Sequence, residues 1–190
     1  DSRDFGFNIA PRVRFTDQFL LTYAFDREKR KNDRGFATTF NDESIFGERD
    51  RVTVTNRITG RYNFNPLNAL TLTFRHYWSN VKYDEPLFTL QDNGRLTKER
   101  GIVIADLDDD PNINFSTWNL DLNYSWQFAP GSFLTALYRN QLFNSNDASE
   151  LGFSDTLDNL FAQPIQHTFS LRIQYFIDYN YLKKVVKQTI

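Results

Sequence analysis

The sequence predicts an all-β protein: an antiparallel transmembrane β-barrel, to which this chain contributes about seven long strands. Three observations support this fold class. Apolar and polar side chains alternate along the predicted strands, short connections alternate with long ones, and aromatic side chains gather beside the short connections. Because successive side chains of a strand point to opposite faces, such a strand has one apolar face and one polar face. Long strands of this kind suit a barrel with lipid outside and water inside.

The segment 166–179 shows the alternation most clearly. Leu171 and Ile173 fall on one face, whereas Ser170 and Arg172 fall on the other. The pattern also continues beyond the usual strand length in globular proteins, about 5–6 residues. This segment is therefore predicted to be the last strand of the barrel.

Six earlier segments follow the same rule and are predicted as strands. Their apolar side chains repeat at every second position: Phe5, Phe7 and Ile9 in 4–15; Phe19, Leu21 and Tyr23 in 19–28; Val52, Val54 and Ile58 in 50–64; Leu70, Leu72 and Phe74 in 69–83; Leu120, Leu122 and Tyr124 in 115–128; Leu134, Ala136 and Tyr138 in 132–143. Polar residues, many of them threonine, asparagine or arginine, occupy the positions between.

The connections differ in length in a regular way. Tight turns with Asp, Asn-Pro or Pro-Gly chemistry are predicted at 16–18, 65–68 and 129–131. The remaining connections are long and polar and are predicted as loops: 29–49, 84–114 and 144–165. Outer-membrane barrels place short turns on the periplasmic side and long loops outside the cell.

The strand count predicts that the barrel is larger than this chain. With the short turns in the periplasm, the first and the seventh strand both run downward, whereas bacterial barrels usually have an even strand number. We therefore expect at least one further strand before Asp1, an export signal upstream, and a barrel of about 14 or more strands. The alternative is an eight-stranded barrel with one unrecognised strand. Residues 1–181 are assigned to the barrel and 182–190 to a short periplasmic tail.

The polar faces carry a set of charged side chains predicted to face the lumen: Arg12, Arg14, Asp26, Arg57, Arg61, Arg75, Asp121, Arg139, Arg172 and Asp178. One interpretation is a charged pore that selects anionic or sugar solutes. The other, which we favour at this point, is a network of salt bridges between neighbouring strands, since the arginine fork pairs well with carboxylates.

Aromatic residues beside the short turns are predicted to form a girdle at the periplasmic interface: Phe15, Phe19, Tyr62, Phe64, Trp126, Phe128, Tyr179 and Tyr181. Aromatic side chains are enriched at membrane–water interfaces because one part of the ring system is apolar and another polar. Aromatics make up 16% of the chain. That share is high for a soluble domain.

Composition excludes several functional classes. The chain has no cysteine, so it has neither disulfides nor cysteine-based metal sites, and its net charge of −2 gives no general attraction to nucleic acid. No run of about 18 apolar residues that could form a transmembrane helix occurs. No phosphate-binding loop, zinc spacing or dinucleotide fingerprint is present. We predict no catalytic residue, no cofactor and no metal site.

Three features give weaker signals, and two of them leave alternatives open. The acidic cluster 106–110 is either a calcium site or a solvated loop, and it lacks an EF-hand spacing. His167 lies at the start of the last strand. Asn56, Gly60 and His76 interrupt the apolar face of two adjacent strands. They mark either a contact with another protein or a tolerated irregularity.

Three stretches carry a family resemblance: the motif RHYWS at 75–79 after the turn NFNP at 63–66, WQFAPGS at 126–132, and FSLRIQYFIDYNYLKK at 169–184. They resemble the C-terminal barrel region of Bacteroidetes-type outer-membrane proteins, in which a carbohydrate-binding family-9-like domain precedes a barrel domain of unknown function. The resemblance implies an upstream β-sandwich that would hold any sugar recognition. It implies no catalytic residue at any position here.

Taken together, the sequence predicts a non-enzymatic protein of the Gram-negative outer membrane. Its partners would be outer-membrane lipid and other outer-membrane proteins. It would act as a transport channel or as a scaffold subunit of a complex that handles glycans or exported proteins. The alternatives are a barrel enzyme with catalytic groups in the extracellular loops, and a soluble ligand-binding barrel with its apolar face inside.

Overall fold

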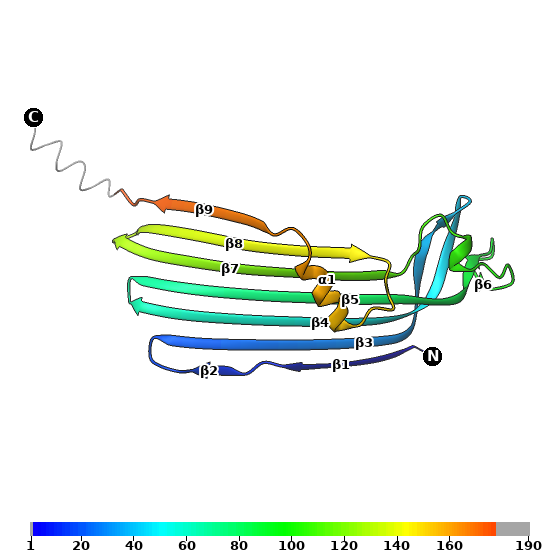
Figure 1. Cartoon of the computed structure of the whole chain (residues 1–190), viewed down its shortest axis with the longest axis horizontal. Coiled ribbons are helices and arrows are strands. Elements are labelled where there is room, and N and C mark those ends of the chain that lie inside the picture. The colour runs from blue at the N-terminus through cyan, green and yellow to red at the C-terminus, as the bar shows by residue number, and fades with distance from the viewer. Residues whose placement is uncertain (1, 178–190) are drawn as a thin grey trace, which may run out of the picture.

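The computed structural model describes residues 2–177 and shows them as one antiparallel sheet (Figure 1). The strands are β1 (Arg3–Ile9), β2 (Arg12–Arg14), β3 (Phe19–Phe40), β4 (Glu43–Asn65), β5 (Asn68–Leu90), β6 (Leu96–Thr97), β7 (Ile113–Ala129), β8 (Ser132–Asn146) and β9 (Gln166–Gln174). Two short helices lie in the connections: the 3-10 helix η1 (Ile104–Asp106) and the α-helix α1 (Phe153–Phe161).

The 9-stranded sheet has the order β1-β3-β4-β5-β7-β8-β9, with β2 also paired to β3 and β6 to β5. Neighbours in the sheet are therefore neighbours in the chain, as in an up-and-down meander. The all-β antiparallel prediction is confirmed. Within the described residues the sheet is open, with β1 and β9 at its edges. Closure into a barrel stays a prediction.

All seven predicted segments contain strands, and the three short turns lie together at one end of the sheet (Figure 1). The first segment is divided into β1 and β2 at Pro11, because proline has no N–H to donate to a neighbouring strand. In the last short turn, Gly131 has a φ of 72°, a conformation that glycine adopts without steric cost. The predicted Pro-Gly turn chemistry explains this tight reversal.

The prediction of a loop over 29–49 is wrong. β3 and β4 continue through this segment as a hairpin and reverse at Asn41 and Asp42, whose φ angles are 51° and 62°. Two adjacent residues with positive φ are typical of a type I′ hairpin turn, and Asn and Asp tolerate it well. The segment lacks apolar alternation, so its sequence does not signal a strand.

Helices and a short strand also interrupt the other two predicted loops. β5 extends to Leu90 and is followed by β6 and η1, and α1 lies within 144–165. None of the helices in residues 2–177 reaches the length and apolar character that crossing a membrane requires.

The strand register confirms that each face is continuous across the sheet. One row of cross-strand partners is apolar apart from one glycine: Leu21, Gly60, Leu72, Leu122, Tyr138 and Phe169. The next row is polar: Thr22, Thr59, Thr73, Asp121, Arg139 and Thr168. A register slip of one residue would mix the two faces, so the alternation itself fixes the pairing.

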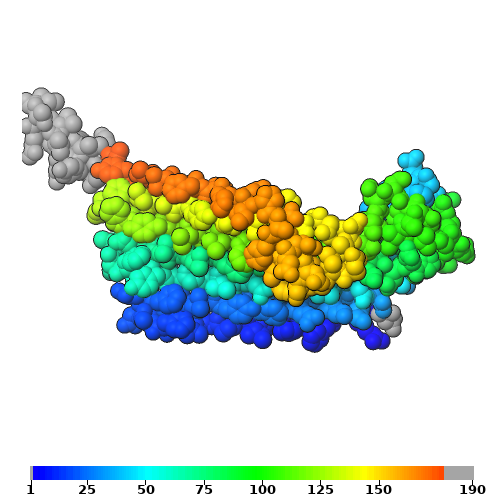
Figure 2. All heavy atoms as spheres, viewed as in Figure 1, coloured from blue at the N-terminus to red at the C-terminus, as the bar shows by residue number. Residues whose placement is uncertain are grey.

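The buried apolar core of the described chain lies at the end of the sheet away from the short turns. Its members are Ile45, Val81, Tyr83, Leu87 and Ile102. We call this region the distal cap; it comprises residues 33–48 and 81–112, which form the mass at the right of Figure 2. We call the opposite half, with the short turns, the proximal half.

Candidate functional site

The polar face of the proximal half is the candidate site. Arg57 on β4 lies directly opposite Arg75 on β5, and both side chains are exposed. Two like charges at directly opposed positions repel each other and destabilise a strand pair. Within residues 2–177, neither guanidinium forms an ion pair.

One ion pair does form within the predicted lumenal set. Arg139 donates to both carboxylate oxygens of Asp121, from Nε at 2.6 Å and from Nη2 at 2.8 Å. This is the bidentate geometry that makes arginine–carboxylate pairs strong. Asp121 therefore pairs with Arg139. It also interacts electrostatically with Arg75, but no carboxylate contacts Arg75 within residues 2–177.

The other members of the set are on the same face but do not form the predicted network among themselves. Arg61 donates from Nε to Asn63 Oδ1 at 3.0 Å. In the described part of the chain no ion pair involves Arg12, Arg14, Asp26 or Arg172. Asp178 lies outside the described residues. The salt-bridge interpretation therefore applies to one pair, and the polar face carries an excess of unpaired arginine.

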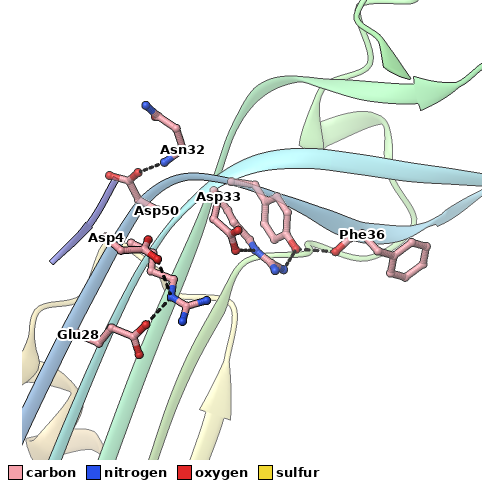
Figure 3. Close-up of polar contacts among 9 residues, drawn as sticks. Asp4, Glu28, Asn32, Asp33, Phe36 and Asp50 are labelled. Carbon is pink, nitrogen blue, oxygen red and sulfur yellow. Dashed lines mark hydrogen bonds and ion pairs between the residues drawn. The ribbon is translucent and has the colours of Figure 1, made fainter. Parts of the chain in front are cut away.

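Charges farther along the strands are paired more completely. Arg30 lies between Glu28, with which it forms a hydrogen-bonded ion pair, and Asp4 on β1, at 3.6 Å from its Nε (Figure 3). The Arg30–Asp4 contact joins the edge strand β1 to β3, whereas Glu28 and Arg30 both lie on β3.

A second cluster links three strands at the base of the distal cap (Figure 3). Arg49 on β4 contacts Asp33 on β3 at 3.2 Å and donates to the hydroxyl of Tyr83 on β5 at 2.9 Å. The Tyr83 hydroxyl in turn donates to the carbonyl oxygen of Phe36 at 2.8 Å. These cross-strand side-chain bonds add to the apolar packing of Tyr83 in the distal cap.

Glu48 in the distal cap has its pKa lowered, first by the hydrogen bond from Arg34 and then by the charge of Lys98. The Arg34 Nε–Glu48 Oε1 distance is 2.9 Å, and the Lys98 Nζ–Glu48 Oε2 distance is 3.6 Å. The loop that contains Lys98 is thereby attached to the β3–β4 hairpin.

The acidic cluster 106–110 serves as a set of turn acceptors. Asp106 accepts from the backbone N–H of Val103 at 3.0 Å, and Asp110 accepts from that of Asn112 at 2.8 Å. Within residues 2–177 no group of acidic or histidine side chains has an arrangement that could hold a metal ion. The solvated-loop interpretation fits these contacts better than a calcium site.

The apolar face is covered at one place, where α1 crosses it (Figure 1). His76 is buried there, contacts the Phe153 ring at a centroid distance of 5.4 Å, and lies 3.2 Å from the Ser116 hydroxyl. The irregularity at His76 thus marks a contact with a helix of the same chain. Asn56 accepts a hydrogen bond from the Tyr23 hydroxyl at 2.8 Å.

Buried hydrogen bonds fix α1 to the sheet. Trp78 Nε1 donates to Asn114 Oδ1 at 2.9 Å, and Asn114 Nδ2 donates to the Thr156 hydroxyl at 2.9 Å. Thr156 and Leu160 are the two buried side chains of α1. A groove of about 500 Å³ remains between α1 and the sheet, lined mainly by apolar atoms.

The comparisons with known proteins give one match. A family model described as a domain of unknown function, DUF5916, matches residues 1–186. The chain belongs to this family. The chain matches no curated protein and no solved structure in the other two comparisons. The DUF5916 description names neither a carbohydrate-binding domain nor a source organism, so that part of the resemblance stays a prediction.

In this DUF5916 domain several of the aromatic residues predicted for the girdle contact one another, and their position at a membrane interface stays a prediction. Phe15 stacks on Phe19 at 5.3 Å, and Phe19 contacts Tyr62 at 6.4 Å. Three further ring pairs, given with the distance between ring centroids, are Tyr62–Phe64 at 5.0 Å, Trp126–Phe128 at 5.9 Å and Phe128–Tyr175 at 6.3 Å. Tyr179 and Tyr181 lie outside the described residues.

Two contacts on the apolar face of this DUF5916 domain were not predicted from the sequence. Tyr175 continues the girdle beside Phe128, and Asn114 connects α1 to β5 through Trp78. Tyr175 could have been found from its place on the apolar face of the last segment. The role of Asn114 depends on α1, and no local sequence signal places that helix on the sheet.

His167, at the start of the last strand, has its Nδ1 2.8 Å from the Tyr138 hydroxyl oxygen.

Proposed function

We propose that this chain is part of a β-barrel in the outer membrane of a Gram-negative bacterium. Its apolar face contacts lipid and its arginine-rich face lines an aqueous lumen. The protein is non-enzymatic and acts as a channel, or as a scaffold subunit of a complex that handles glycans or exported proteins. The observation that carries this proposal is the register, which keeps one face apolar across every long strand.

The extent of the bare apolar face supports this orientation. On β3 it runs from the girdle at Phe19 to Arg27, a stretch with the length of a transmembrane β-strand, about 9–11 residues. Arg27 pairs with Val54, which pairs with Trp78, one of the residues that α1 contacts. The other α1 contacts, at His76 and Trp118, lie two residues closer to the short turns. We place the outer membrane interface at this level.

The character of α1 agrees with an interfacial position. Thr156 and Leu160 face the sheet and are buried, whereas Asp155, Asp158 and Asn159 are exposed. The acidic side of α1 therefore points away from the sheet, where headgroups or water could solvate it but hydrocarbon could not. At that level α1 covers His76 and Asn114, polar groups that would be costly beside hydrocarbon.

The two open edges have a consequence in this setting. Every backbone N–H and C=O in the hydrocarbon region needs a protein partner, and an open sheet edge leaves a row of them unpaired. We therefore propose that β1 and β9 pair with further strands, so that this chain forms the C-terminal part of a larger barrel. Outer-membrane lipid and other outer-membrane proteins are the proposed partners.

Because the chain has no cysteine, single cysteines can test the orientation directly. Leu72 and Thr73 are adjacent on β5 and lie on opposite faces. We expect a spin label at L72C in the full-length protein, reconstituted in liposomes, to be quenched by oxygen dissolved in the bilayer. A label at T73C should be quenched by a water-soluble nickel chelate. The reverse pattern would support a soluble-type barrel with its apolar face inside and would overturn the proposal.

A further inference from the structure

We propose that Arg57 and Arg75 together form a binding site for an oxyanion, the carboxylate, phosphate or sulfate group of a solute. This inference rests on the proposed function, because it assigns a solute class to the aqueous lumen. It concerns the centre of the polar face in the proximal half, where the two arginines lie on adjacent strands.

The strand register brings the two guanidinium groups within reach of one anion. Directly opposed residues of an antiparallel pair have Cβ atoms about 4.5–5.5 Å apart. Arg57 and Arg75 are opposed in this way and both project from the polar face. Each guanidinium offers five N–H donors in a planar fork that matches the geometry of an oxyanion, so one anion could receive hydrogen bonds from both.

The surroundings leave both forks available. Asp121, the carboxylate beside Arg75, already receives two hydrogen bonds from Arg139. Asp26 is two positions along β3 from Ala24, the partner of Arg57, and no ion pair joins it to Arg57 among the described residues. The donors of Arg57 and Arg75 therefore lack a carboxylate partner in residues 2–177.

Neutral hydrogen-bonding residues surround the pair. Asn119 follows Arg75 in the same cross-strand row, and its Oδ1 accepts from Gln141 Nε2. The neighbouring row contributes Thr59 and Thr73. Opposed like charges cost stability in the absence of a ligand. An anion bound between them would remove that repulsion, and this relief favours anion binding.

The test measures anion binding to the full-length protein in detergent by titration calorimetry, with inorganic phosphate, acetate and glucose as probes. We expect phosphate and acetate to bind and glucose to give no heat. The double variant R57Q/R75Q should bind phosphate at least about tenfold more weakly, since hydrogen bonds to charged groups are lost. R57K/R75K keeps the charges without the fork and should show an intermediate affinity.

The matched control is R12Q/R14Q, which removes two arginines from the same face at β2. It should bind phosphate within about twofold of the parent protein, because β3 separates β2 from Arg57 on β4 and salt screens much of the attraction between charges that far apart. No phosphate binding in the parent, or equal losses in R57Q/R75Q and R12Q/R14Q, would overturn the inference. Binding of glucose as tight as that of phosphate would also overturn it.

The outcome is separable from that of the proposed function. If the labels at Leu72 and Thr73 report lipid and water as expected but phosphate does not bind, only the anion site is wrong. If those labels report the reverse faces, the membrane proposal is wrong, whatever the calorimetry shows. Reversal potentials in planar bilayers then give a second measurement: R57Q/R75Q should lower anion selectivity, and R12Q/R14Q should change it less.

Discussion

The proximal half and the distal half of the sheet, the latter being the part that carries α1 and the distal cap, are built from the same strands but are stabilised differently. In the proximal half both faces are bare, one apolar and one rich in arginine. In the distal half protein covers both faces: α1 crosses the apolar face, and Ile102 of the distal cap packs with Val81 and Tyr83 on the opposite face. Val81 and Tyr83 alternate in phase with Arg75 on β5.

This difference shows how long strands can adapt to two surroundings. Where lipid is the proposed solvent, apolar side chains need no cover and charges are kept to one face. Beyond that level the proposed solvent is water, and there the strands have an apolar core of their own and cross-strand ion pairs. The boundary between the two halves lies at the row of Arg27 and Trp78, where α1 contacts the sheet, and the Arg49 cluster lies farther along the same strands, at the base of the distal cap.

The largest expected effect is in the distal cap. Ile45 is fully buried in the core of the cap. I45A should therefore lower the free energy of unfolding of the cap by about 2–5 kcal/mol, through lost burial and a residual cavity. Hydrogen exchange should accelerate over 33–48, whereas amides near the short turns keep their protection. Equal acceleration in both halves would mean that they unfold as one unit.

A slightly smaller effect is expected in the proximal half. L72R places a cation on the apolar face and should destabilise the protein in liposomes by about 2–4 kcal/mol if that face contacts lipid. The matched variant T73R, on the polar face, should lie within about 0.5 kcal/mol of the parent. Urea unfolding in liposomes measures both. Similar losses for L72R and T73R would contradict the division into two faces.

The attachment of α1 tests the boundary itself. N114A removes the acceptor of the buried Trp78 N–H, and a buried polar group left unpaired costs about 1–3 kcal/mol. It also removes a donor to Thr156, whose hydroxyl keeps its hydrogen bond to the Gly152 carbonyl oxygen. We expect faster exchange in 153–161 and increased exposure of Trp78, read from tryptophan fluorescence. S145A, on β8 and exposed, is the control and should change neither.

The smallest expected effect is a pH dependence of the distal cap. Because the folded-state pKa of Glu48 lies below its ordinary value of 4.5, its contribution is fully present above that value and is lost as the pH falls through the lower, folded-state pKa. Limited proteolysis between Arg95 and Arg100 should therefore become faster in acid. In E48Q the rate should be higher at neutral pH and vary less with pH.

The comparison of sequence and structure follows the same boundary. The proximal strands, their faces and the turn at Gly131 could be predicted, because alternation and turn chemistry are local signals. The continuation of β3 and β4 could not be predicted. Its side chains are charged, and they favour a strand only once the register brings partners such as Arg34 and Glu48 together.

The candidate site divides in the same way. Alternation alone placed the arginines on one face. Whether they pair was decided by register, which set Asp121 against Arg139 but Arg57 against Arg75. Likewise the sequence marked His76 as an irregular position, and only the tertiary structure brought α1 over it. Local periodicity fixes the direction of a side chain, but its partner depends on contacts between residues distant in the chain.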